Sequence, residues 1–344
     1  MKFFHVSFAL FSVTLFLDRR SSTACYGKPI INEGPEDSDR SIRALKSPSM
    51  RPSKLPKNGQ TKAPTLDINA SLEVICEFLG MKVITKCRDL TRIQGIIQNY
   101  GAIPTEIGLL TKLTDIDISI VSNKLPSTIG LLTTLRRLKV ACLGDNVKST
   151  TIPTSIGKMT SLSELSLTKC QYTNPIPSEI RQLKKLNAVY LDKNQFKGRF
   201  PDFGGLTSLT TLSLVGNKFN GTLPTSLSQF PKLRDFQIQD NLFSGEVSVV
   251  AKLTKLHTFD ASGNLLVGSI PNSFGSLSAL SQLDLARNKL VGTIPSMIGK
   301  LVFLQKIDLA MNALTGSIPL SIGNLKALED MNLSKNKLMG TIPS

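Results

Sequence analysis

The feature that most constrains this chain is a repeat of 23 or 24 residues that runs through its C-terminal half. Asparagine returns at this interval, at positions Asn194, Asn217, Asn241, Asn264, Asn288, Asn312 and Asn336. Each asparagine closes the pattern L-x-x-L-x-L-x-x-N, as in Leu280 to Asn288. Apolar residues two positions apart predict a short strand with one buried face. One such unit cannot bury its apolar face alone, so the units must stack on one another.

Counting the first leucine of each unit gives eleven units, which begin at residues 90, 113, 135, 162, 186, 209, 233, 256, 280, 304 and 328. A period in the twenties with this motif is the leucine-rich-repeat signature. The longer pattern L-x-G-x-I-P-x-x-I-G-x-L, seen from Leu290 to Leu301, resembles the plant-type leucine-rich-repeat family over roughly residues 90–344. This resemblance implies an α/β-type solenoid, curved and right-handed. Its parallel β-sheet would line the concave face, and irregular or 3-10 segments would form the convex side.

Other positions of the repeat also have a physical reason. The asparagine carboxamide can satisfy backbone groups where the chain leaves the strand, and its removal would cost about 1–3 kcal/mol for each buried group left unpaired. The aromatic residues Tyr172, Phe196, Phe219 and Phe243 occupy one position of successive units, so we expect them to stack inside the solenoid. The glycine that follows permits a positive φ or a close approach of neighbouring coils. Ile-Pro pairs such as Ile294-Pro295 predict an extended segment.

The N-terminal quarter has a different organisation. Residues 1–24 combine Lys2, an apolar stretch and small residues before Cys25, which predicts a secretory signal peptide. Residues 25–66 are rich in proline, serine and basic residues and have few apolar ones, so we expect a disordered basic spacer. No later segment is long and apolar enough to predict a membrane span. These features predict a secreted protein.

Residues 67–89 occupy the place of the family's N-terminal cap, and the resemblance implies a Cys76–Cys87 disulfide there. The usual tryptophan of that cap is missing, because the chain contains none. We expect Cys142 and Cys170 to be core thiols rather than partners of each other. Sequons at Asn69, Asn220 and Asn332 permit glycosylation of a secreted chain. The units before residue 160 are irregular, and the last unit stops at Ser344 without a closing cap.

The residue between the two inward-facing leucines of each strand points onto the concave face. The column contains an acidic run, Asp260, Asp284 and Asp308, where like charges on adjacent strands repel. Toward the other end lie Arg136, Arg137 and Lys139, with Tyr190 as a central aromatic residue. We interpret these seven residues as a bipolar docking face with an aromatic anchor for a protein partner. The alternative is that these charges are simply solvated.

Catalysis is not indicated. Only two histidines exist, His5 and His257, and no metal-ligand spacing, glycine-rich phosphate loop or nucleophile elbow occurs. An open sheet gives no reason for a carboxyl with a raised pKa, so the acidic column does not predict acid–base chemistry. We therefore expect no enzyme activity and no cofactor. The net charge of +16 suits an acidic cell-wall glycan, whereas secretion and the absence of a stacking platform argue against nucleic acid.

One short element bears on biological setting. Arg43-Ala44-Leu45-Lys46 resembles the R-x-L-R element of secreted oomycete effectors, although Lys46 replaces the final arginine and no Glu-Glu-Arg follows. The resemblance implies delivery into plant cells, where such effectors suppress defence or cell death. The alternative is a plant apoplastic protein, either a receptor ectodomain or one similar to polygalacturonase-inhibiting proteins. Both readings predict a non-enzymatic protein that binds a partner through its concave face.

Overall fold

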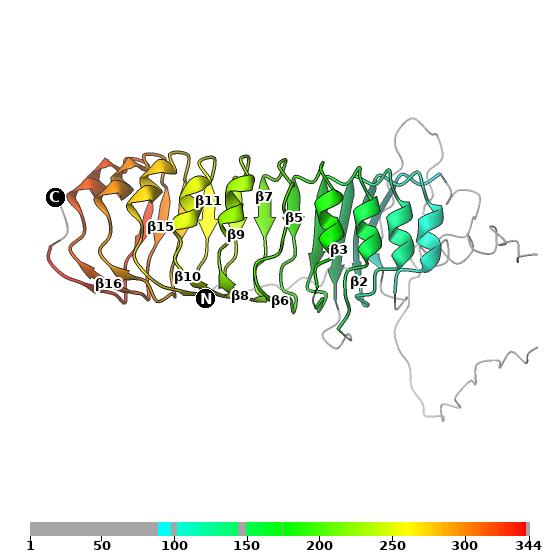
Figure 1. Ribbon diagram of the computed structural model, residues 1–344, viewed down its shortest axis with the longest axis horizontal. Helices are drawn as coiled ribbons and strands as arrows, with labels where there is room; N and C mark the ends of the chain where they lie inside the picture. The colour runs from blue at the N-terminus through cyan, green and yellow to red at the C-terminus, as the bar shows by residue number, and fades with distance from the viewer. Residues whose placement is uncertain (1–88, 98–101, 144–148, 174, 342–344) are drawn as a thin grey trace, which may run out of the picture.

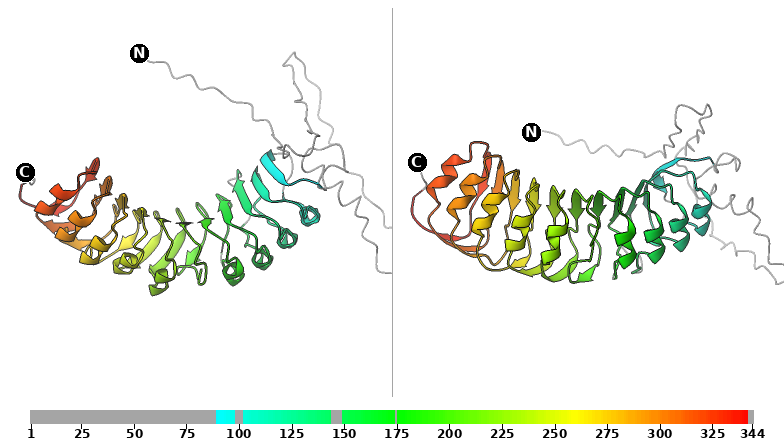
Figure 2. Two further views of the ribbon diagram at one scale, coloured as in Figure 1. Left: turned by 90° about the horizontal axis from the view of Figure 1, so that it is seen from above. Right: turned by 45° about the horizontal axis from the view of Figure 1, so that its top comes forward.

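The computed structural model describes residues 89–97, 102–143, 149–173 and 175–341. The expected signal peptide (1–24), the spacer (25–66) with its Arg43–Lys46 element, and Asn69 lie outside the described residues. The same holds for the cap pair Cys76 and Cys87. The described chain forms one curved solenoid, whose strands line the inner side of the arc and whose short helices line the outer side (Figure 2).

The concave face is one parallel sheet of eleven strands, ordered along the chain as β1-β2-β3-β4-β5-β7-β9-β11-β13-β15-β17 (Figure 1). Each unit of the sequence repeat supplies one strand, as the period of two within L-x-L predicted. The strands are β1 (Arg92–Ile97), β2 (Asp115–Ile120), β3 (Arg137–Cys142), β4 (Glu164–Thr168), β5 (Ala188–Tyr190), β7 (Thr211–Ser213), β9 (Asp235–Gln237), β11 (Thr258–Asp260), β13 (Gln282–Asp284), β15 (Lys306–Asp308) and β17 (Asp330–Asn332).

The convex side consists of single-turn 3-10 helices, all but one preceded by proline among the described residues. Pro295, for example, has φ −72° and ψ 142°, and its carbonyl accepts a hydrogen bond from Ile298 N at 3.0 Å. Proline fixes φ and has no N–H to leave unpaired at the helix start. The helices are η1 (Thr105–Leu109), η2 (Ser127–Leu131), η3 (Thr154–Lys158), η4 (Ser178–Gln182), η5 (Thr225–Gln229), η6 (Ser248–Lys252), η7 (Asn272–Ser276), η8 (Ser296–Lys300) and η9 (Leu320–Asn324).

Two small sheets run along the flank between strand and helix. They contain β6 (Lys197–Gly198), β8 (Lys218–Thr222), β10 (Leu242–Gly245) and β12 (Leu265–Leu266), then β14 (Val291–Gly292), β16 (Ala313–Gly316) and β18 (Lys337–Leu338). Glycine serves two purposes, one in the flank sheets at Gly292 and one in η8 at Gly299. Gly292 has φ +78°, and a Cβ on Gly299 would lie 2.3 Å from the carbonyl oxygen of Ser321 in the next coil.

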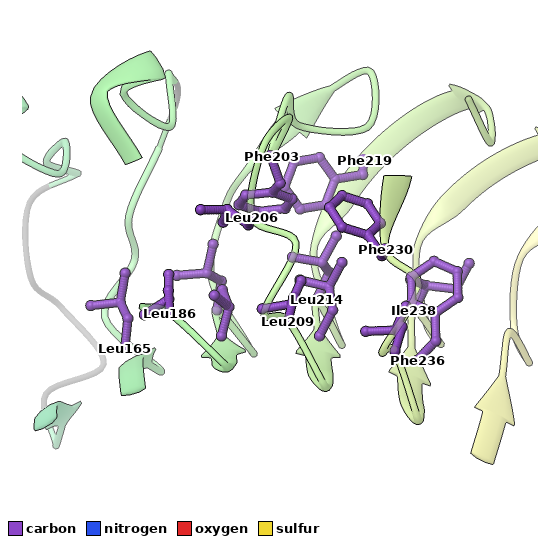
Figure 3. Packing of buried hydrophobic residues seen from close by; sticks show 14 of the residues in the cluster. Leu165, Leu186, Phe203, Leu206, Leu209, Leu214, Phe219, Phe230, Phe236 and Ile238 are labelled. Carbon is purple, nitrogen blue, oxygen red and sulfur yellow. The ribbon is translucent and has the colours of Figure 1, made fainter. Parts of the chain in front are cut away.

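The coils share one continuous apolar interior. Side chains from the strands and from the convex segments meet between the two layers, as shown for Leu165, Leu214, Phe230 and Phe236 in Figure 3. The predicted aromatic stack is confirmed: the ring centroids of Tyr172 and Phe196 are 6.4 Å apart, and two further stacked pairs extend the series. Because each coil buries its apolar side chains against the next, stability depends on contacts between neighbours.

The asparagines form the predicted polar ladder inside this apolar interior. Asn241 Nδ2 donates to Leu214 O of the preceding coil at 2.9 Å and to Ile238 O of its own coil at 3.1 Å. Its Oδ1 accepts from Phe219 N, again in the preceding coil, at 3.1 Å. One side chain thus satisfies backbone groups of two coils, which water cannot reach.

The expectation for Cys142 and Cys170 is wrong, because these two residues form a disulfide with a Cα–Cα distance of 4.8 Å. Cys142 ends β3, and Cys170 follows β4 in the next coil. Parallel neighbouring strands bring these two positions together, and both side chains are buried. The bond therefore ties together the irregular units on either side of residues 144–148.

Replacing both cysteines, Cys142→Ala with Cys170→Ala, should lower the free energy of unfolding by about 3–4 kcal/mol, since it opens a loop with a sequence separation of 28. Urea unfolding with and without reductant measures the loss. Val140→Ala is a control on the same strand: it removes buried contacts but no crosslink, so its loss should not depend on reductant. Two free thiols in the untreated protein, found by alkylation and peptide mapping, would contradict the pairing.

Candidate functional site

The outward-facing residues of the concave sheet form one continuous row across all eleven strands. The register pairs Gln94 with Asp117, Asp117 with Lys139, and so on to Asp308 with Asn332. The complete row is Gln94, Asp117, Lys139, Ser166, Tyr190, Ser213, Gln237, Asp260, Asp284, Asp308 and Asn332. This is the column predicted from the repeat, and we call it the central row.

The predicted basic cluster is not a free basic patch. Arg137 contacts Asp115 at 3.1 Å on the preceding strand and Glu164 at 3.8 Å on the following one. Lys139 contacts Glu164 at 2.7 Å. Of these three basic residues, Arg136, which is exposed, is the one that forms no ion pair with a described residue. Acids from the row beside the central row therefore pair with two of the three basic residues. The bipolar docking face itself stays a prediction.

Tyr190 lies at the middle of the sheet and is half-buried. Burial raises the pKa of its hydroxyl, and the nearby Glu164 carboxylate adds to the effect. Beside it, Asp192 accepts hydrogen bonds from Ser213 Oγ at 2.5 Å and from Val215 N at 3.0 Å. Burial also raises the pKa of Asp192. The centre of the face thus offers an aromatic ring beside a fixed carboxylate.

Asp260, Asp284 and Asp308 lie on adjacent strands in direct register, as predicted, and we call them the aspartate ladder. Each carboxylate accepts a hydrogen bond from a backbone N–H two residues later, at 2.9–3.0 Å. Burial, with a contribution from its two acidic neighbours, raises the pKa of Asp284 to about 6. The expectation that an open sheet gives no raised carboxyl pKa is therefore wrong, because half-burial on a curved sheet already removes part of the solvent.

A long-range contact crosses the sheet beside the ladder. Arg287 Nη2 donates to Asp240 Oδ1 at 3.1 Å, although the two residues belong to coils that are not neighbours and have the coil of Gly263 between them. The contact passes over Gly263, where a Cβ would approach Asp240 Oδ1 to 2.5 Å. Glycine leaves room here for the bridge, whereas its φ of +62° is also adopted by Asp240 and Arg287 at the equivalent positions. No sequence pattern indicates this bridge, because its partners are 47 residues apart.

The two described sequons differ in environment. Asn220 lies exposed on β8 of the flank, away from the central row. Asn332 lies on the concave sheet, where its Nδ2 donates to Asp308 Oδ2 at 3.0 Å and its Oδ1 accepts from Ser334 Oγ at 2.8 Å. Glycosylation at either position stays a prediction.

Within the described ranges, we find no group of histidine, cysteine or acidic residues able to hold a metal ion. The helices of the same ranges are all too short and too polar to cross a bilayer.

A repeating motif, a continuous parallel sheet and an outer row of 3-10 helices define a leucine-rich-repeat solenoid. The family description "leucine-rich repeat region" matches residues 92–286, more than half of the chain. A single-repeat description matches residues 279–301 and 303–325. The chain therefore belongs to the leucine-rich-repeat family, in its plant-type form. None of the curated protein sequences matches it.

Several solved structures are similar to this chain. The plant peptide hormone receptor RGFR1, solved in complex with RGF2, has 30% identity and a TM-score of 0.66 over 74% of this chain. The PEPR1–AtPEP1 structure has 32% identity and a TM-score of 0.62 over 73%. The Arabidopsis receptor kinase HAESA, solved with the peptide hormone IDA and the co-receptor SERK1, has 26% identity and a TM-score of 0.55 over 76%. The chain spans 42%, 38% and 52% of the length of these three proteins.

The aspartate ladder predicts a pH-dependent stability. Because the folded pKa of Asp284 lies above its ordinary value of 3.8, its contribution to stability is complete below about pH 4 and is lost as the pH rises through about 6. Asp284→Asn removes the charge and keeps an oxygen for Ala286 N, so it should stabilise the fold at pH 7.5 by up to about 1 kcal/mol and have little effect at pH 4.

Urea unfolding of the two proteins at both pH values tests this prediction. Asp117→Asn is the control, in the same row but next to Lys139 rather than between two acids. An Asp284→Asn gain that is equal at pH 4 and pH 7.5 would contradict the proposed charge effect.

Proposed function

We propose that this protein is a non-enzymatic recognition protein that binds an extended peptide or protein segment along the central row. The observation that carries the proposal is the unbroken register of that row across eleven strands, at a fixed spacing of about 4.8 Å. Every strand but β7, whose Ser213 is buried, displays a side chain of the row. The chain is also similar to receptors solved with bound peptides, such as RGFR1 with RGF2 at 30% identity, and this similarity supports a peptide as the ligand.

The proposed contact residues follow from the geometry. Tyr190 is the aromatic anchor at the centre, because a half-exposed ring supplies large contact area with little loss of side-chain freedom. On one side lie the ion pairs of Arg137 and Lys139 with Glu164, which a polar peptide can rearrange, and the exposed Arg136. On the other side, the aspartate ladder (Asp260, Asp284 and Asp308) favours a basic residue of the ligand, since such a residue relieves the repulsion between the carboxylates.

Binding to the central row can be tested without knowing the natural ligand. Peptides are selected from a random display library on the immobilised full chain, and their affinities are then measured by calorimetry. Tyr190→Ala, and Arg136→Ala with Arg137→Ala and Lys139→Ala, should each weaken the selected peptides about tenfold or more. Lys218→Ala with Lys289→Ala changes exposed flank residues and should leave their affinity unchanged. Selected peptides that bind both concave variants as tightly as the unaltered protein would place the binding surface elsewhere.

The same binding function fits two settings, and different observations support each. A plant apoplastic protein, such as a receptor ectodomain or an inhibitor, is supported by the similar receptors and by the Cys142–Cys170 disulfide, since disulfides persist in oxidising compartments. A secreted effector that enters plant cells and suppresses defence is supported by Arg43-Ala44-Leu45-Lys46 behind the signal peptide. Both settings include secretion, which residues 1–24 predict.

Removal of the spacer, residues 25–66, separates the settings. An effector should lose its entry into plant cells, and with it any suppression of induced cell death, because the deletion removes the Arg43–Lys46 element. An apoplastic protein should stay outside the cell in both forms. Imaging of tagged proteins expressed with their signal peptide, with cell death scored in the same leaves, measures both properties. A variant with only Arg43→Ala and Leu45→Ala is the matched control for loss of the whole spacer. Equal location and equal cell death for all three proteins would remove the support for the effector setting.

A further inference from the structure

Exposed lysines gather along the edge where each convex helix leads into the next concave strand. This edge comprises the last residue of each 3-10 helix and the two residues that precede the first leucine of the next strand motif. From Leu109 to Ala327 these positions, all described, contain nine lysines and no acid. We call them the lysine rim: Lys112, Lys158, Lys184, Lys185, Lys232, Lys252, Lys255, Lys300 and Lys326. All nine are exposed. The rim follows the upper edge of the molecule in Figure 1, opposite the flank strands β6, β8 and β10.

The lysines of the rim have few partners among the described residues. Lys112 contacts Asp89 at 2.6 Å, and Lys184 Nζ donates to Gly205 O at 3.4 Å. The other seven form no ion pair with any described residue. On the concave face, Arg137, Lys139 and Arg287 have acidic partners, whereas the exposed Arg136 has none among the described residues. The rim differs in having a series of such unpaired lysines, with no acid, along one edge of the described coils.

Folding does not require these lysines. The turn from helix to strand is closed by backbone hydrogen bonds, such as Leu253 N to Val250 O at 2.9 Å and Leu256 N to Leu253 O at 2.9 Å. Lysines in the last helical turn, such as Lys252, gain a little from the helix carbonyls, but these helices are a single turn long. Neighbouring cations such as Lys252 and Lys255 repel each other, so a ligand of opposite charge would stabilise the rim.

The other rim positions indicate what kind of ligand fits. Many carry hydroxyl groups, namely Thr111, Thr133, Thr134, Thr160, Ser161, Thr207, Ser208, Thr254, Ser276 and Ser278. Phe303 lies between Lys300 and Lys326 in sequence and is 64% exposed. Hydroxyl groups bond to the hydroxyls of sugars, and the face of an aromatic ring attracts their C–H groups.

We propose that the lysine rim binds a linear acidic polysaccharide, whose carboxylates pair with the lysines of successive coils. The rim is a narrow edge with one or two lysines in most coils, which matches an extended polymer. A lipid surface is less well matched, because the rim offers only Val302 and Phe303 as large exposed apolar side chains between Lys232 and Lys326. Nucleic acid is less well matched too, because the rim has no series of aromatic residues for stacking bases. This surface is separate from the central row, so peptide and polysaccharide bind without competing.

The test uses the full chain and polygalacturonate, a linear polymer of acidic sugars. Binding is measured at several salt concentrations, with fully methyl-esterified polymer as the uncharged probe. The rim variant carries Lys252→Gln, Lys255→Gln, Lys300→Gln and Lys326→Gln. Its affinity for polygalacturonate at 0.1 M salt should fall by about tenfold or more, and this affinity should depend less steeply on salt. The control variant Lys218→Gln, Lys289→Gln, Lys335→Gln and Lys337→Gln removes the same charge from exposed positions outside the rim and should bind within about threefold of the unaltered protein.

Three results would overturn the proposal. Equal weakening in the two variants would show an effect of net charge alone, and no weakening in the rim variant would place the site elsewhere, for example in the basic spacer. The third result concerns another class of ligand. The rim variant would bind phosphatidylserine vesicles or duplex DNA more weakly than the unaltered protein does, while its binding of polygalacturonate stays unchanged. None of these results affects the test of the central row, which uses other residues and another probe.

Discussion

Hydrogen bonding by buried asparagines is the interaction on which the rest of this structure depends. Every coil turns away from its strand inside an apolar stack, where water cannot satisfy the freed carbonyl and N–H groups. Asn264 donates to Ile238 O of the preceding coil at 3.0 Å and to Ala261 O of its own at 3.1 Å, and it accepts from Phe243 N at 2.9 Å. The ladder thereby joins each coil to its neighbour in one register. That register places the outer side chains, and so the central row and the lysine rim both follow from it.

The sequence predicted those features that each unit specifies for itself. The strand positions, the aromatic stack, the asparagine ladder and the whole central row all follow from the alignment of one unit on the next. Contacts between different rows could not be predicted in this way. The pairing of Arg137 with Asp115 and Glu164 joins three strands and lies outside the column that the repeat singles out. The Cys142–Cys170 bond was missed because the extra residues after Cys142 obscure the alignment of the two units. The residues directly before the buried asparagines have positive φ, and Lys193, Asp240 and Met311 are examples. Their side chains share no chemistry that would indicate this conformation.

Charge is divided between two surfaces with different properties. On the concave face, acids and bases alternate across neighbouring strands or are held by backbone N–H groups, so a ligand must compete with existing partners. Such a surface favours specificity over affinity, because only a ligand that replaces these contacts in the right geometry gains free energy. On the rim, most lysines have no partner within the described coils, so a polyanion gains attraction without displacing one. Under the two proposals, one scaffold binds a particular peptide on its concave face and a generic polymer along its edge.

The concave face responds to acid through the aspartate ladder. As the pH falls through about 6, Asp284 takes up a proton and the aspartate ladder loses charge, which weakens its attraction for a basic residue of a ligand. In the proposed function, a moderate acidification thus weakens the binding of a basic ligand residue at the aspartate ladder. The response of Asp284 arises first from the partial burial of its carboxylate on the curved sheet and then from repulsion by Asp260 and Asp308.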